Sequence, residues 1–142
     1  MIRRALIGIL LILGITAGQA WGQTGISGDN QFNQCETKPY TITIENTSGA
    51  DVTEIVITAQ LGNLTGFTYT PPSQIVIDNG SPTICPGSTE PTQSGSDLIW
   101  DIDDLCGGSI VLAPGGTLSV TFNLTTDCTA VSGSLNAQVD YV

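Results

Sequence analysis

Three carboxylates lie close together in the stretch WDIDD, residues 100–104. Residues two apart in a strand share one face, so Asp101 and Asp103 would point the same way. Calcium takes several carboxylate oxygens as ligands, and Asp104 would supply another. The stretch lacks the glycine spacing of an EF-hand loop, so an acidic strand edge exposed to solvent is the competing interpretation. We therefore treat Asp101, Asp103 and Asp104 as candidate calcium ligands.

Catalytic chemistry has little support elsewhere in the chain. The sequence has no histidine, which excludes Ser-His and Cys-His nucleophile pairs. A pair of carboxylates acting as in glycosidases would need a buried acid with a raised pKa. Among the pairs of acids, only the one in residues 100–104 lies beside an aromatic side chain, and the pattern there gives no sign of such burial. The sequence predicts no enzyme and no cofactor other than calcium.

The N-terminus resembles a secretion signal. Arg3 and Arg4 precede an apolar run over residues 5–18, and AWG at residues 20–22 fits a small-x-small cleavage site. The run is shorter than the roughly 18–20 residues that a membrane span needs, although a membrane anchor is the alternative. We expect residues 1–22 to be a cleaved signal peptide, with no membrane span in the mature chain. The protein is then secreted or exposed at the cell surface.

Four cysteines follow this signal, and none of them forms a C-x-x-C motif: Cys35, Cys85, Cys106 and Cys128. Without histidine or paired cysteines, a zinc site is not favoured. An even number of cysteines behind a signal peptide is typical of disulfides. Two bridges are therefore expected, and the sequence alone leaves three pairings open.

The charge of the mature chain limits its partners. All 13 acids lie after residue 22, where Lys38 is the only base, so the net charge of residues 23–142 is −12. Phosphate would be repelled, which excludes a nucleic-acid partner and disfavours an anionic lipid surface. The acids either keep an exposed surface soluble, or they reflect cation loading or a salty habitat.

Four N-x-S/T triplets are candidate glycosylation sites. They begin at Asn46, Asn63, Asn79 and Asn123. The first three fall in predicted turns, and Asn123 falls on the polar side of a predicted strand. A chain rich in Ser and Thr also produces such triplets by chance, so the two interpretations remain open.

The elements that must position these residues are strands. Apolar side chains alternate with polar ones over residues 40–45, 53–61, 97–103, 118–124 and 135–141, and no amphipathic helix follows the signal. Pro71 and Pro72 divide residues 66–80 into two short pieces, because proline lacks a ladder donor. Residues 81–96 are predicted to be a long loop. The pattern predicts an all-β antiparallel sandwich of about seven strands over residues 38–142, with residues 23–37 as a linker or an edge strand.

Several of these stretches together resemble the conserved repeat family called domain of unknown function 11. They are YTITIENTSGADVTEIVIT from residue 40, LIWDIDDL from residue 98, LAPGGTLSVTFNLT from residue 112 and GSLNAQVDYV from residue 133. The resemblance implies an immunoglobulin-like sandwich of the kind repeated in bacterial and archaeal surface proteins. Two features depart from the family: the sequence holds one copy, and residues 81–96 look like an insertion.

The resemblance also implies a strand pairing and a disulfide pairing. In the family topology the strand over residues 40–45 pairs with the strand over residues 118–124, antiparallel. This arrangement brings Cys35 close to Cys128 and leaves Cys85 to pair with Cys106.

The sequence therefore predicts a contact function. We expect a non-catalytic structural or adhesive module of a cell-surface protein, whose partners are other surface domains or copies of itself. One alternative is an extracellular filament subunit assembled by donor-strand exchange, because a sandwich of this kind would have one more edge strand. Three sources of this additional strand are open: a longer chain, residues 23–34, or a neighbouring molecule. Another alternative is a secreted carbohydrate-binding module that uses Tyr69 and Trp100.

Overall fold

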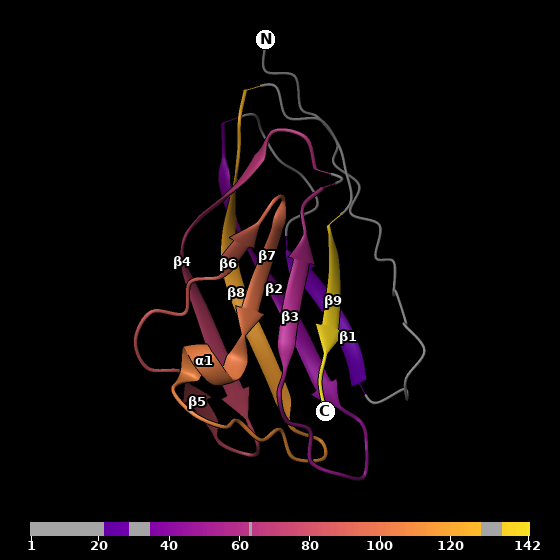
Figure 1. Cartoon of the computed structure of the whole chain (residues 1–142). Coiled ribbons are helices and arrows are strands. Elements are labelled where there is room, and N and C mark those ends of the chain that lie inside the picture. The colour runs from indigo at the N-terminus through magenta and orange to yellow at the C-terminus, as the bar shows by residue number, and fades with distance from the viewer. Residues whose placement is uncertain (1–21, 29–34, 63, 129–134) are drawn as a thin grey trace.

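The computed structural model describes residues 22–28, 35–62, 64–128 and 135–142. These residues form two antiparallel sheets that pack face to face as a sandwich (Figure 1). One sheet has five strands in the order β1-β2-β8-β4-β5, and the other has four in the order β6-β7-β3-β9. The predicted all-β sandwich is confirmed. No helix in this part of the chain is long and apolar enough to cross a membrane.

The bounds of the elements show how the chain alternates between the sheets. The five-stranded sheet contains β1 (Gly22–Gly28), β2 (Thr37–Asn46), β4 (Phe67–Asp78), β5 (Pro82–Ile84) and β8 (Thr117–Thr126). The four-stranded sheet contains β3 (Val56–Gln60), β6 (Thr92–Ser94), β7 (Asp97–Asp101) and β9 (Asn136–Asp140). A single-turn helix, α1 (Ile102–Cys106), follows β7 directly.

The core lies between the sheets and follows from the alternation in the sequence. Every second side chain of β8, and of β2 from Tyr40 onward, is buried, because one face of each strand meets the other sheet. The two strands pair antiparallel, with Tyr40 opposite Phe122 and Ile44 opposite Leu118, as the family resemblance implied. From the other sheet, Trp100 packs on Phe122 with 5.1 Å between ring centroids.

β4 differs from its prediction because it continues through the two prolines. The register of its pairing with β8 shifts between Thr70 and Gln74. Pro71 and Pro72 fall in this shift, where no ladder donor is required of them. One irregular strand therefore replaces the two short pieces that were predicted.

The predicted loop over residues 81–96 and the predicted strand over residues 97–103 also differ from the structure. The loop contains β5 and β6, which raises the strand total in the described residues to nine, against about seven predicted. β7 ends at Asp101, and α1 begins at Ile102, where the sequence predicted that the strand would continue. Asp101 caps this helix, and Gly107 ends it in a left-handed conformation with φ 77°. Capping residues at both ends favour one helical turn over a continued strand.

Part of the predicted segment over residues 23–37 belongs to the sandwich, namely residues 23–28 in β1. β1 pairs antiparallel with β2 over its whole length, from Gly22 opposite Asn46 to Gly28 opposite Tyr40. It is the outermost strand of the five-stranded sheet. Except for Gly22, the expected signal peptide lies outside the described residues.

Candidate functional site

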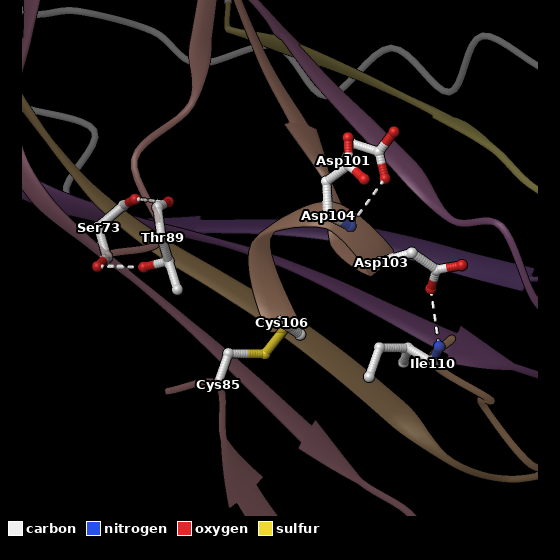
Figure 2. The surroundings of a disulfide bond; sticks show 8 residues. All are labelled: Ser73, Cys85, Thr89, Asp101, Asp103, Asp104, Cys106 and Ile110. Atoms are coloured by element: carbon white, nitrogen blue, oxygen red, sulfur yellow. Dashed lines mark hydrogen bonds between the residues drawn. A yellow bond between two sulfur atoms is a disulfide. The ribbon is translucent and has the colours of Figure 1, made fainter. Parts of the chain in front are cut away.

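The acids around α1 serve the local backbone. The carboxylate of Asp101 accepts a hydrogen bond from the backbone N of Asp104 at 3.4 Å. The carboxylate of Asp103 points toward Ile110 and accepts from its backbone N at 2.7 Å (Figure 2). Asp101 ends a strand and Asp103 lies in a helix, so the two side chains do not share a strand face as predicted.

The calcium prediction therefore loses the geometry on which it was based. Among the described residues, no group of three or more Cys, Asp or Glu side chains is arranged to hold a metal ion. Calcium binding by Asp101, Asp103 and Asp104 stays a prediction that rests on their charge and closeness in sequence alone.

The disulfide Cys85–Cys106 joins the two sheets beside these acids. Cys85 follows β5 of the five-stranded sheet, and Cys106 ends α1, which continues β7 of the four-stranded sheet (Figure 2). The Cα atoms are 4.8 Å apart, and the bridge closes a loop over a sequence separation of 21. The backbone N of Cys85 also donates to the carbonyl of Ile75 at 3.0 Å, which extends the contact between β5 and β4.

After Cys85 the chain returns to the irregular part of β4. Thr89 donates its hydroxyl to the carbonyl of Ser73 at 2.6 Å, and the hydroxyl of Ser73 donates to the carbonyl of Thr89 (Figure 2). The indole N–H of Trp100 donates to the same Ser73 hydroxyl at 3.2 Å. Ser73 and Thr89 are both buried. The segment that was predicted to be a loop is therefore fixed to the core.

Glu90 also attaches this segment to β4, and it contributes to a raised pKa of Tyr69. The hydroxyl of Tyr69 donates to one carboxylate oxygen of Glu90, and the backbone N of Ser73 donates to the other at 3.3 Å. Burial, and then the hydrogen bond to Glu90, raise the pKa of Tyr69 to about 12. Tyr69 therefore remains a neutral hydrogen-bond donor well above neutral pH.

The second disulfide, Cys35–Cys128, closes the opposite end of the five-stranded sheet. Its Cα atoms are 5.0 Å apart, and its residues are separated by 93 positions in the sequence. Cys35 precedes β2 and Cys128 follows β8, so the bridge ties together the ends of two paired strands. Nearby, Nζ of Lys38 lies 3.6 Å from a carboxylate oxygen of Glu36. Both expected disulfide pairings are confirmed.

The four candidate glycosylation sites have different surroundings. Asn46 is only 1% exposed, and its Nδ2 donates to the carbonyls of Ala50 and Leu112 at 2.9 and 2.7 Å. Both features disfavour a glycan at Asn46 in the folded chain, because the sugar would replace one of the two Nδ2 hydrogens and would need space that the buried side chain does not have. Asn79 is exposed and Asn123 lies on the outer face of β8, so they stay predictions. Asn63 lies outside the described residues.

A row of paired hydroxyls covers the outer side of β2 and β8, and we call it the hydroxyl face. It consists of Thr37, Thr41, Thr43, Ser119, Thr121 and Thr125. The hydroxyl oxygens are 2.9 Å apart in the pair Thr41–Thr121, 3.2 Å in Thr43–Ser119 and 2.6 Å in Thr37–Thr125. No member is ionisable, although the chain is strongly acidic. The alternating Thr and Ser of both strands were the signal for this face, but only their pairing assembles it.

The aromatic residues considered for sugar binding are poorly placed for that role. Trp100 is fully buried, at 0% exposure, and its N–H is engaged by Ser73. Tyr69 is partly buried, and its hydroxyl is bound to Glu90. Stacking on a saccharide needs an open aromatic face, so Trp100 cannot serve in the folded protein.

No protein-family model matches the chain, and no curated protein shows significant similarity to it. The similarity to domain of unknown function 11 therefore stays a resemblance.

Proposed function

We propose that this chain is a non-catalytic module of the cell exterior that works by structural and adhesive contact. The observation that carries the proposal is the pair of disulfides, one within a sheet and one between the sheets. Disulfides form and persist in oxidising compartments, and they are rare in the cytosol. Such bridges are typical of a domain that must stay folded outside the cell.

The hydroxyl face is the surface that we propose for contact. It lies across the central strand of the five-stranded sheet, and its six members carry no charge, although Glu45 follows Thr43 on the same side of β2. The acids that lie elsewhere on the surface repel other acidic surfaces. An uncharged face lined with groups that both donate and accept hydrogen bonds lets another surface domain approach closely. Other surface domains of the same organism are the proposed partners.

The adhesive role can be tested with one substitution on each sheet. Thr121→Asp places a charge in the middle of the hydroxyl face. Thr58→Asp makes the same change on the outer face of β3, a central strand of the other sheet. Labelled residues 23–142 should bind to source cells, Thr121→Asp should bind much less, and Thr58→Asp should bind as the unchanged chain does. Equal binding by the two variants, or no binding at all, would remove this role.

A filament subunit is the second candidate, and a specific feature favours it. β9 is the outermost strand of the four-stranded sheet, and no strand among the described residues pairs with its outer edge. Such an edge can accept a strand donated by a neighbour. Negative-stain microscopy of the secreted protein distinguishes the candidates, because fibres would favour the filament and dispersed particles the module.

A further inference from the structure

The two long sides of the sandwich are built differently. On one side the outermost strands are β5 and β6, which have three residues each and are bounded by Pro82 and Pro91. Short strands and prolines are common ways to protect a sheet edge from pairing. On the other side the outermost strands are β1 and β9, which contain neither proline nor lysine. These two strands lie in contact (Figure 1), so both sheets end together on one side.

The core is incompletely covered on the side of β1 and β9. Ala137 and Val139 of β9 face inward, opposite Ala59 and Ile57 of β3. The two β3 residues are 0% exposed, whereas Ala137 and Val139 are only partly buried. Ile26 of β1 packs against the core in the same partly buried way. Apolar area that remains in contact with water here would be removed by a further strand beside β9.

The charge pattern indicates that a second copy can supply that strand. The net charge of residues 23–142 is −12, yet β1 has no ionisable residue and β9 has only Asp140. If two β9 strands pair antiparallel with Gln138 opposite its equivalent, Ala137 faces Val139 of the second copy. Asn136 then faces Asp140 of the second copy, so each carboxylate meets an amide rather than another acid. This register keeps acids apart and brings the partly exposed apolar side chains together.

We propose that two copies form a closed dimer through this side of the sandwich. A two-fold axis relates them, β9 pairs with β9, and the four-stranded sheet becomes continuous across both copies. Because β1 lies beside β9, β1 of one copy meets β1 of the other, and the five-stranded sheet is extended as well. A two-fold interface is closed, and it pairs the two edge strands that have no outer neighbour among the described residues, so the dimer does not grow further. The inference is independent of the adhesive role of the hydroxyl face.

The dimer can be tested by light scattering coupled to size-exclusion chromatography on residues 23–142. The unchanged chain should elute with twice the monomer mass and dissociate on dilution. Gln138→Glu should give the monomer mass, because Gln138 lies on the axis and two acids would then face each other. Gln93→Glu is the control for the same change at an edge: it lies in β6, the opposite edge of the same sheet, and should leave the dimer intact. Gln138 also donates to the carboxylate of Asp140 in its own chain at 3.2 Å, so the result for Gln138→Glu counts only with the second variant.

A second variant keeps the test valid if Gln138→Glu folds poorly. Val139→Lys places a charge that points inward at the edge, where its long side chain can reach solvent in the monomer but not in the dimer. Circular dichroism should show the same strand signal in all variants. A monomeric unchanged chain, or a dimer that survives both β9 substitutions, would overturn the proposal. Extended fibres would also overturn it, and they would support the filament candidate.

Discussion

The hydroxyl of Ser73 lies at the irregular part of β4, where it accepts the indole N–H of Trp100 and donates to the carbonyl of Thr89. One buried side chain thus connects β4, the core and the segment that follows Cys85. Asn46 has a similar role at the end of β2, where its amide binds Ala50, Leu112 and Ser48. Neither residue was singled out as structural from the sequence, because an isolated Ser or Asn gives no periodic signal. Their importance depends on partners that are distant in the chain.

Ser73→Ala should therefore destabilise the fold, because it leaves the buried N–H of Trp100 without an acceptor. We expect a loss of about 2 kcal/mol in the free energy of unfolding. Ser119→Ala removes a hydroxyl from the partly exposed hydroxyl face and should change this free energy by no more than about 0.5 kcal/mol. Urea unfolding with both disulfides intact measures the two values. Equal losses for the two variants would contradict the role given to Ser73.

Tyr69 gives the fold a dependence on alkaline pH. Its pKa is raised from the ordinary 10.0 to about 12, so the folded chain keeps a proton that the unfolded chain releases. The contribution of Tyr69 to stability is therefore fully present below about pH 10 and is lost as the pH rises toward about 12. Chemical unfolding across this range should show a steeper fall for the unchanged chain than for Tyr69→Phe. Parallel curves would show that Tyr69 titrates alike in both states.

At the scale of elements, the strands with a buried face were predictable and the exceptions have local causes. Apolar and polar residues alternate in β2, β3, β8 and β9, and this alternation indicates that one face of each strand packs on the core. β5 and β6 are short, and all their residues are exposed, so they leave no alternation to detect. α1 depends on caps at Asp101 and Gly107, because a five-residue helix is too short for a periodic pattern.

In the candidate site, the residue types were visible in the sequence, but the way that the fold arranges them was not. The cysteines were visible, but their pairing came from the topology that the family resemblance implied. The acids of residues 100–104 were also visible, yet a strand was assumed where one helical turn redirects Asp103 toward Ile110. The hydroxyl face needed the register of β2 against β8, and register is a property of the sheet rather than of either strand.

Removing each disulfide should separate its contributions to stability. Replacing Cys35 and Cys128 by alanine opens a loop with a sequence separation of 93, and should cost about 5 kcal/mol in the chain-entropy description. Replacing Cys85 and Cys106 opens one of 21 and should cost about 3 kcal/mol. Only the second pair should also expose residues 85–91 to protease, because that bridge anchors the segment to α1. Denaturant unfolding and limited proteolysis measure the two effects, and equal protease resistance of both variants would contradict this assignment.

At the scale of the whole molecule, the acids are concentrated at one end of the sandwich. The end that carries α1 and Val142 also carries Glu45, Asp51, Glu54, Asp78, Asp101, Asp103, Asp104 and Asp140. Lys38 lies at the other end, near Cys35–Cys128. Like charges gathered in this way repel one another in the folded state more than in the extended chain. The disulfides oppose that repulsion, since each limits how far the unfolded chain can expand.

Salt should therefore stabilise this protein, and the same experiment separates screening from calcium binding. Raising sodium chloride from low concentration to about 0.15 M shortens the screening length to about 8 Å, so the Tm should rise. Calcium chloride at matched ionic strength should raise the Tm further only if Asp101, Asp103 and Asp104 bind the ion together. Asp104→Asn is the matched variant for that case, because the hydrogen bond of Asp104 uses its backbone N and survives the change. A Tm that falls or stays constant with sodium chloride would show that the concentrated acids do not limit stability.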